Sequence, residues 1–178
     1  MICYSQKRLK NIYLLEGMNY KDYIESIQDF PKEGILYRDI QPLLENHTVF
    51  MDAVKDMGRL VDYKHVKYWV GIESRGFIFA SALSMIYGGG VKLIRKSGKL
   101  PNENLKRVNY TLEYGIDTIE MKSGSGSVVL VDDIYATGGT MKASEELSKI
   151  CGYDIIDKLC LLDIGIVKDH DIKCLISY

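Results

Sequence analysis

The distribution of apolar residues predicts strands and helices in alternation along most of the chain. Apolar residues recur at helical spacing over 49–61, and 77–87 is small and apolar on most sides, so both segments are expected to be helices. Apolar runs at 66–72, 91–94 and 128–132 predict strands, and the last is wholly apolar up to its final acid, as in a strand with both faces covered. A helix over 141–150 and strands over 155–162 and 172–176 follow. This order predicts an α/β fold with a single doubly wound, mainly parallel sheet flanked by helices.

The N-terminal part of the chain has a less regular pattern. Apolar side chains at Tyr23, Ile24, Ile27 and Phe30 have helical spacing and predict a helix over 21–30. An irregular segment follows up to residue 44, and Thr48 is the expected N-cap of the helix at 49–61. Residues 1–17 show no period and are interpreted as a possible extension of a single domain that covers 1–178.

Composition narrows the classes of function. The chain has 178 residues and a net charge of −1, so no long-range positive field draws it to nucleic acid or to an acidic membrane. Its four cysteines have no metal-ligand spacing and are expected to be reduced thiols. No apolar run is long enough to span a membrane, and the N-terminus lacks the apolar region of a signal peptide. We therefore expect a soluble, cytoplasmic protein without nucleic-acid or membrane partners.

Three segments with candidate chemistry follow predicted strands, at 73–76, 95–109 and 132–140. In a doubly wound sheet, ligands bind beyond the carboxyl ends of the strands, which is where these segments are expected. Segment 95–109 has no apolar period and holds five basic residues, so it is expected to be a functional or flexible loop.

The sequence DDIYATGGT at 132–140 is the strongest of these signals. The backbone N–H groups around Gly138 and Gly139 are expected at the start of a helix, where the dipole and the free amides favour an anion. Asp132 and Asp133 stand just before this anion site and would be repelled by a phosphate alone. Ribose hydroxyls donate hydrogen bonds to carboxylates, so a phosphorylated ribose accounts for both halves of the motif.

VVLVDDIYATGGT at 128–140 closely resembles the 13-residue signature of the type I phosphoribosyltransferases, which bind 5-phosphoribosyl 1-pyrophosphate. The resemblance implies that Asp132 and Asp133 contact the ribose hydroxyls. It also implies that the 5-phosphate is wrapped by a loop made of Ala136, Thr137, Gly138, Gly139 and Thr140. The signature does not identify the base.

Other segments resemble the adenine phosphoribosyltransferases, and they occur in that family's order: FPKEGILYRDIQPLL at 30–44, GIESRGFIFA at 71–80, RKSGKLP at 95–101 and YTLEYG at 110–115. The likeness implies a small N-terminal hood over 18–45, where Leu36 and Arg38 address adenine through backbone groups and Tyr37 lies beside the ring. It implies a pyrophosphate site made of Glu73, Ser74, Arg75 and Gly76. A mobile loop would add Arg95, Lys96 and Lys99, and Glu113 would be the catalytic acid/base.

The implied reaction joins adenine to the phosphoribosyl group and gives AMP and pyrophosphate. Mg²⁺ is the expected cofactor, held mainly by substrate phosphates without a dedicated set of protein ligands. A homodimer is usual in the family. The chain departs from the family at Glu33, Tyr37, Ile134 and Tyr135 and in the short SGSGS turn at 123–127. Two alternatives stay open: transfer to another base, such as hypoxanthine, xanthine or orotate, and a non-catalytic sensor of the sugar donor.

Overall fold

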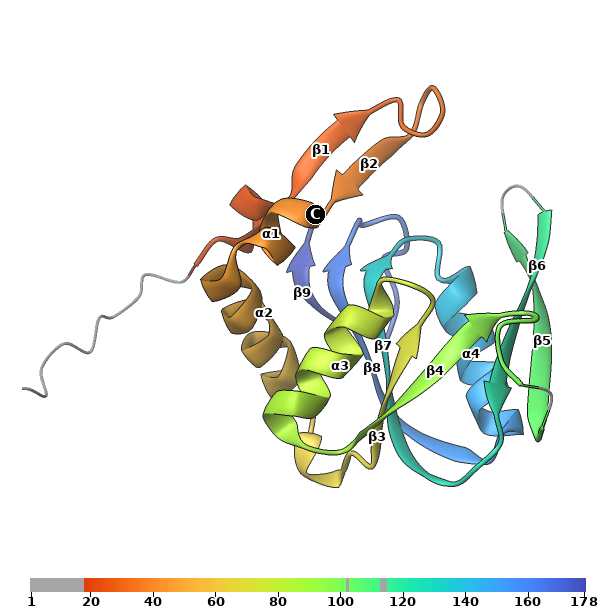
Figure 1. Cartoon of the computed structure of the whole chain (residues 1–178). Coiled ribbons are helices and arrows are strands. Elements are labelled where there is room, and N and C mark those ends of the chain that lie inside the picture. Colours follow the sequence, from red (N-terminus) through yellow and green to blue (C-terminus); the bar gives the residue numbers. More distant parts are fainter. Residues whose placement is uncertain (1–17, 102, 113–114) are drawn as a thin grey trace, which may run out of the picture. The chain divides into compact units, whose positions relative to one another are not determined.

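The chain divides into two compact units, residues 1–43 and 44–178. The structure is a computed structural model that describes residues 18–101, 103–112 and 115–178 (Figure 1). Within these residues, no helix is both long enough and apolar enough to cross a bilayer.

The N-terminal unit contains a short 3-10 helix, η1 (Tyr20–Tyr23), and a two-stranded antiparallel sheet of β1 (Glu25–Gln28) and β2 (Leu36–Asp39). The prediction of a helix over 21–30 is therefore wrong. Helical spacing over ten residues stabilises a helix only weakly on its own, and here the backbone of β1 pairs with β2 instead. The connecting turn is closed by the N–H of Gly34, which donates to Asp29 Oδ1 at 2.7 Å.

A seven-stranded sheet forms the centre of the C-terminal unit, with the strand order β5-β6-β4-β3-β7-β8-β9. The strands β4, β3, β7, β8 and β9 are parallel, and β5 and β6 form an antiparallel extension beside β4. Their bounds are β3 (Tyr68–Ile72), β4 (Gly90–Lys96), β5 (Leu105–Leu112), β6 (Gly115–Lys122), β7 (Gly126–Tyr135), β8 (Tyr153–Asp163) and β9 (Lys173–Ser177). The predicted mainly parallel sheet is confirmed.

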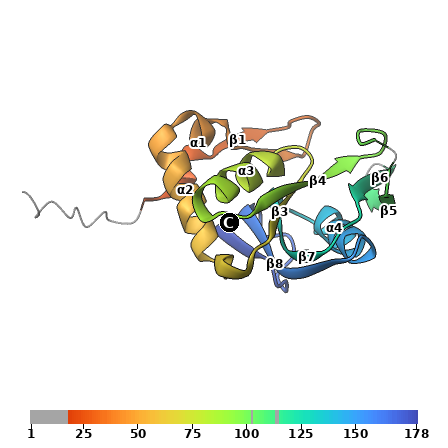
Figure 2. The same cartoon turned by 60° about the horizontal axis from the view of Figure 1, so that its bottom comes forward.

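Helices cover the two faces of this sheet (Figures 1 and 2). The helix α3 (Gly76–Tyr87) contacts β3, β4 and β7, and α2 (His47–Arg59) lies beside it. The helix α4 (Gly139–Ile150) contacts β5, β6, β7 and β8. Two smaller helices, α1 (Gln41–Glu45) and η2 (Tyr63–His65), precede and follow α2. The helices predicted at 49–61, 77–87 and 141–150 are thus present within two residues of their predicted bounds.

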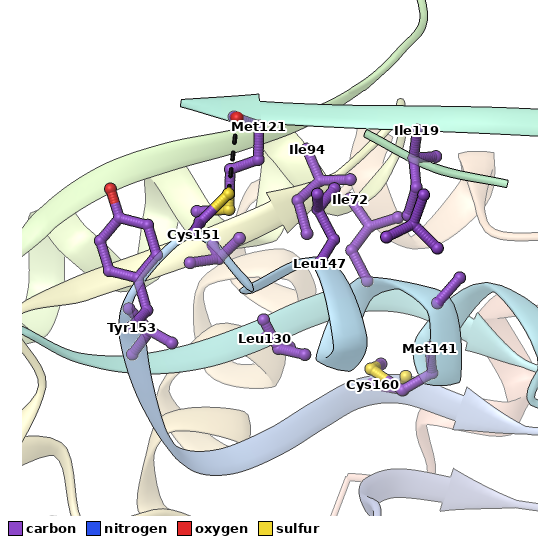
Figure 3. Packing of buried hydrophobic residues seen from close by; sticks show 14 of the residues in the cluster. Ile72, Ile94, Ile119, Met121, Leu130, Met141, Leu147, Cys151, Tyr153 and Cys160 are labelled. Carbon is purple, nitrogen blue, oxygen red and sulfur yellow. Dashed lines mark hydrogen bonds between the residues drawn. The ribbon is translucent and has the colours of Figure 1, made fainter. Parts of the chain in front are cut away.

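The core between α4 and the sheet consists mostly of aliphatic and sulfur-containing side chains, with the rings of Tyr135 and Tyr153 (Figure 3). Leu147 of α4 lies among Ile72, Ile94 and Leu130, all of which have 1% exposure or less. The Cys151 thiol donates to the Met121 carbonyl at 3.5 Å, at the end of α4. Burial of each large aliphatic side chain stabilises the fold by roughly 1.5–3 kcal/mol, so this layer holds α4 against the strands.

Some element boundaries differ from the prediction. The N-cap of α2 is Asn46, whose side chain accepts from the N–H of Val49 at 3.2 Å, and not Thr48; asparagine caps helices at least as well as threonine. The strand β7 continues to Tyr135 because it pairs with β8 as far as Asp163. The segment predicted as a loop at 95–109 contains the end of β4 and the start of β5, which leaves 97–104 between the strands.

The carboxylate of Glu120 anchors this connection between β4 and β5. Glu120 lies on β6 and is fully buried. Its Oε1 accepts from the backbone N–H groups of Lys99 and Leu100, both at 2.8 Å, and its Oε2 accepts from Arg107 Nε at 3.0 Å. Burial raises the pKa of Glu120, but these hydrogen bonds outweigh the burial and hold the pKa below its ordinary value.

We predict that Glu120→Gln lowers the free energy of unfolding at pH 7 by about 2 kcal/mol, because a charge-assisted network loses its acceptor toward Arg107. A carboxylate with a lowered folded-state pKa stabilises the protein above its unfolded pKa, near 4.5. That stabilisation is lost as the pH falls through the folded-state pKa. Denaturant unfolding between pH 3 and 7 should therefore show the wild type and the variant converging below about pH 4.5.

Glu146→Gln is the matched control, because Glu146 is an exposed carboxylate on α4. The free energy of unfolding of Glu146→Gln should stay within about 0.5 kcal/mol of the wild-type value from pH 3 to pH 7. A constant difference between wild type and Glu120→Gln at every pH would contradict the anchoring role of the charge.

Candidate active site

Three connecting segments leave the sheet at the same edge. The strands β4, β3 and β7 are parallel neighbours, so their carboxyl ends lie side by side. The segments 73–75, 97–104 and 136–138 begin at these ends. The structure therefore brings together the three segments in which candidate chemistry was predicted, as expected for ligand sites in doubly wound sheets.

Gly76, at the start of α3, sets the contact between the β3–α3 turn and the strand β7. A Cβ atom on Gly76 would lie 2.5 Å from the Val131 carbonyl oxygen and 3.2 Å from Asp132 Oδ1. Any side chain would push the β3–α3 turn away from β7, so the absence of one allows the close approach. Within the turn, the peptide between Glu73 and Ser74 is cis.

An ion pair joins the β3–α3 turn to β7. Arg75 Nε lies 2.8 Å from Oδ2 of the buried Asp133. The pair is an electrostatic contact, because its angles do not meet hydrogen-bond geometry at Oδ2. Burial raises the pKa of Asp133, and the charge of Arg75 opposes this rise. The positive group of the β3–α3 turn thus neutralises an acid of β7.

Asp132 is the more perturbed of the two acids. Burial raises its pKa well above the ordinary value, and the neighbouring Asp133 charge raises it further. Its Oδ1 accepts from the backbone N–H of Asp133 at 2.9 Å. A ligand that donates hydrogen bonds to Asp132 would relieve the cost of keeping two adjacent carboxylates ionised. Sugar hydroxyls have this donor chemistry.

The third segment forms a glycine-rich entry to α4. Gly138 is the N-cap with φ of 81°, a left-handed conformation that favours glycine, and no side chain caps the helix. The first N–H groups of the helix have no partner within it, so they are available to an anion. Burial raises the pKa of Tyr110 on β5 and the Thr140 side chain opposes this rise, and α4 packs against β5. Ala136, Thr137 and Gly139 complete this loop.

Glu73 holds a basic residue of the neighbouring strand. Its carboxylate accepts from Arg95 Nε at 3.1 Å and from an Arg95 terminal nitrogen at 3.4 Å, and it also accepts from the N–H of Lys96. Burial raises the pKa of Glu73, but the Arg95 and Lys96 hydrogen bonds prevail and the pKa lies below its ordinary value. The Arg95 guanidinium also lies 5.6 Å from the centre of the Phe77 ring.

The remaining basic side chains are more exposed. Lys96 Nζ lies 3.2 Å from Asp117 Oδ2, and the Lys96 side chain is 59% exposed. Lys99 is exposed, while its backbone N–H is held by Glu120. The pattern of basic residues indicated this loop, but it did not indicate the buried carboxylate that anchors it.

In the N-terminal unit, the predicted adenine-binding residues Leu36, Tyr37 and Arg38 all lie on β2. Leu36 and Arg38 are two positions apart, so their backbone groups point to the same edge of the strand. The Tyr37 ring lies edge-on to Phe30, with centroids 5.1 Å apart. Glu113, the predicted acid/base, lies outside the described residues. Its role stays a prediction.

Comparisons with known proteins agree in assigning the family. A family model described as a phosphoribosyl transferase domain matches residues 44–177. The adenine phosphoribosyltransferase of Hydrogenovibrio crunogenus is 46% identical over 144 residues, covering 80% of this chain and 83% of that protein. That of Bdellovibrio bacteriovorus is 39% identical over 166 residues, covering 90% of this chain and all of that protein.

Solved structures give the same result. The adenine phosphoribosyltransferase of Rhodothermus marinus superposes with a TM-score of 0.81 at 31% identity, covering 89% of this chain and 96% of that one. That of Saccharomyces cerevisiae, in complex with an imino-altritol bisphosphate and adenine, has a TM-score of 0.81 at 29% identity, covering 88% and 96%. The sheet topology and these likenesses together show that the chain belongs to the phosphoribosyltransferase family and has the type I fold.

Proposed function

We propose that this protein transfers the 5-phosphoribosyl group of 5-phosphoribosyl 1-pyrophosphate to adenine, which gives AMP and pyrophosphate. The observation that carries the proposal is the end of β7, where two adjacent acids stand beside an uncapped helix N-terminus. Relatives with 46% and 39% identity are adenine phosphoribosyltransferases, and the yeast structure contains adenine. These likenesses support adenine as the acceptor.

Each group of residues has a task in this reaction. Asp132 and Asp133 orient the ribose through its hydroxyls, and Ala136 to Thr140 bind the 5-phosphate at the start of α4. Arg75, with Arg95, Lys96 and Lys99, stabilises the charge of the departing pyrophosphate. Glu73 contributes by holding Arg95. Ser74 and Gly76 complete the turn that binds the pyrophosphate.

The base is bound and activated by the other predicted residues. Leu36 and Arg38 hydrogen-bond adenine through backbone groups, and Tyr37 lies against its ring. Glu113 takes the proton that the adenine ring nitrogen loses as it bonds to the sugar carbon. As the bond to pyrophosphate breaks, the sugar gains oxocarbenium character, and the loop over 97–104 excludes the water that would otherwise react with it.

Magnesium fits this site through the substrate. Among the residues that the structure describes, no group of three or more His, Cys, Asp or Glu side chains could hold a metal ion. Mg²⁺ commonly keeps several waters and binds substrate phosphates with few protein ligands. When bound, Mg²⁺ would neutralise charge on the pyrophosphate, and Asp132 and Asp133 would be carboxylate partners for it or for its waters.

We also propose a cytoplasmic homodimer. The helix α3 carries no charged residue, and its outer side exposes Ile78 and Met85, the latter with 87% exposure. An exposed, uncharged helix face is a common feature of surfaces between subunits. The N-terminal extension over 1–17 lies outside the described residues.

An assay of the bases tests the proposed reaction directly. Purified protein with the sugar donor and Mg²⁺ should convert adenine to its nucleotide at least tenfold faster than hypoxanthine, xanthine or orotate. The reason is that each extra or missing hydrogen bond between a base and its pocket changes the rate by about this factor or more. Release of pyrophosphate measures each rate. Faster turnover of hypoxanthine would overturn the choice of base, whereas donor binding without turnover of any base would favour a sensor.

Glu113→Gln should reduce kcat about a hundredfold or more, because the transition state loses its proton acceptor. The dissociation constant of the sugar donor should stay within twofold, since the donor does not contact this group. Glu146→Gln, a change to an exposed carboxylate on α4, is the control and should keep wild-type turnover. A Glu113→Gln variant with near-normal kcat would remove Glu113 from the mechanism.

Met85→Lys should convert the proposed dimer into a monomer, because it places a charge in the centre of an apolar surface. Light scattering after size exclusion gives the mass. Ile150→Lys is the matched control, since Ile150 is 49% exposed at the end of α4 and should leave the dimer intact. A wild-type mass near 20 kDa would disprove the dimer itself.

A further inference from the structure

Tyr135, the last residue of β7, lies directly against Gly138, the N-cap residue of α4. A Cβ atom on Gly138 would be 2.7 Å from the Tyr135 hydroxyl oxygen and 3.2 Å from two carbons of the ring. The ring is almost completely buried, with 7% exposure. The tip of this side chain therefore forms the surface on which Gly138 lies.

The ring also contacts a histidine side chain. The imidazole of His170 lies 4.5 Å from the Tyr135 ring, centroid to centroid, at an angle of 57°. His170 Nε2 in turn lies 3.3 Å from Asp163 Oδ2. Asp163 is the partner of Tyr135 in the β7–β8 ladder, so all three side chains gather at the carboxyl ends of adjacent strands.

Hydrogen bonds fix the orientation of the histidine and of the acid. The N–H of Ile172 donates to His170 Nδ1 at 3.3 Å, so Nδ1 is the acceptor and Nε2 carries the proton that faces Asp163. The other oxygen of Asp163 accepts from the N–H of Gly165 at 2.8 Å. The side chains of His170 and Asp163 are 15% and 12% exposed. The histidine and the acid thus form a largely buried, hydrogen-bonded pair next to the Tyr135 ring.

We propose that Tyr135 is a positioning residue for the 5-phosphate site, and that His170 and Asp163 act on that site through it. The inference rests on the proposed role of residues 136–140 in binding the 5-phosphate. Gly138 has a left-handed backbone conformation and no side chain of its own to fix it. Contact with a rigid, buried ring limits its movement, so the N–H groups at the start of α4 stay aimed at one point.

The ring also suits a position beside an anion. Burial raises the pKa of Tyr135, and the Asp163 carboxylate raises it further. The phenol therefore stays neutral near neutral pH and does not repel a phosphate. His170 contributes no substrate contact in this scheme and serves to hold the ring.

The test compares two ligands that differ in whether they need the 5-phosphate site. Calorimetry of the whole protein should show that His170→Ala and Tyr135→Leu each weaken ribose 5-phosphate binding about fivefold, the size of one lost aromatic contact. Pyrophosphate binding, which does not involve Gly138, should stay within twofold. In steady-state assays, KM for the sugar donor should rise while kcat changes less than twofold.

Two further variants distinguish positioning by the ring from a direct contact with the ligand. Tyr135→Phe keeps the ring and should bind ribose 5-phosphate within twofold of wild type; a fivefold loss would assign a direct contact to the hydroxyl and overturn the proposal. Adding His170→Ala to Tyr135→Leu should cause no further loss, because no ring remains to be held. Fully additive losses would overturn the proposal. Tyr135→Leu and Tyr135→Phe keep the test decisive if His170→Ala does not fold.

Asp169→Ala is the matched control, since Asp169 is an exposed residue next to His170, and its ribose 5-phosphate binding should equal that of wild type. If the wild type itself does not bind ribose 5-phosphate, the proposed 5-phosphate site is wrong and the present proposal falls with it. If the wild type binds it and Tyr135→Leu and His170→Ala bind equally well, only the role of Tyr135 is overturned.

Discussion

The close approach of Gly76 to the end of β7 is the contact on which the candidate site depends. A side chain at this position would meet the Val131 carbonyl at 2.5 Å, so the β3–α3 turn can reach β7 only because none is present. The approach brings Arg75 to Asp133 and places both turns at one edge of the sheet. Parallel pairing of β3 with β4 then adds Arg95, which Glu73 holds. An ion pair therefore joins the β3–α3 turn to β7, and a second ion pair joins the same turn to β4.

Local sequence pattern accounted for most of the C-terminal unit. The apolar strand β3 and the apolar run 128–131 within β7 are predicted well because burial on both faces leaves one interpretation. The segment 21–30 was interpreted wrongly because its apolar spacing fits a short helix, whereas pairing with β2 decides its structure. Such pairing joins residues that are distant in the sequence, and spacing within one segment does not contain that information.

In the candidate site, too, some residues are recognisable from the local sequence and others only from distant partners. The acids at 132–133 and the glycines at 138–139 stand together in the sequence, so a local motif was enough to indicate them. Glu120 and His170 act through partners many positions away, and their own surroundings in the sequence carry no special signal. Glu120 even interrupts an apolar pattern in a way typical of a solvent-exposed strand residue. Only the folded arrangement shows that its charge is enclosed.

The bond between Glu73 and Arg95 has a consequence for the release of products. An anion that reaches the Arg95 guanidinium meets an arginine already engaged by a carboxylate at 3.1 Å. The anion must share or displace the Glu73 carboxylate, so the anion binds Arg95 less tightly than it would bind an unpaired arginine. If Arg95 binds the departing pyrophosphate as proposed, the Glu73 carboxylate would compete with that pyrophosphate for the same guanidinium. This competition would limit how tightly the leaving group is held.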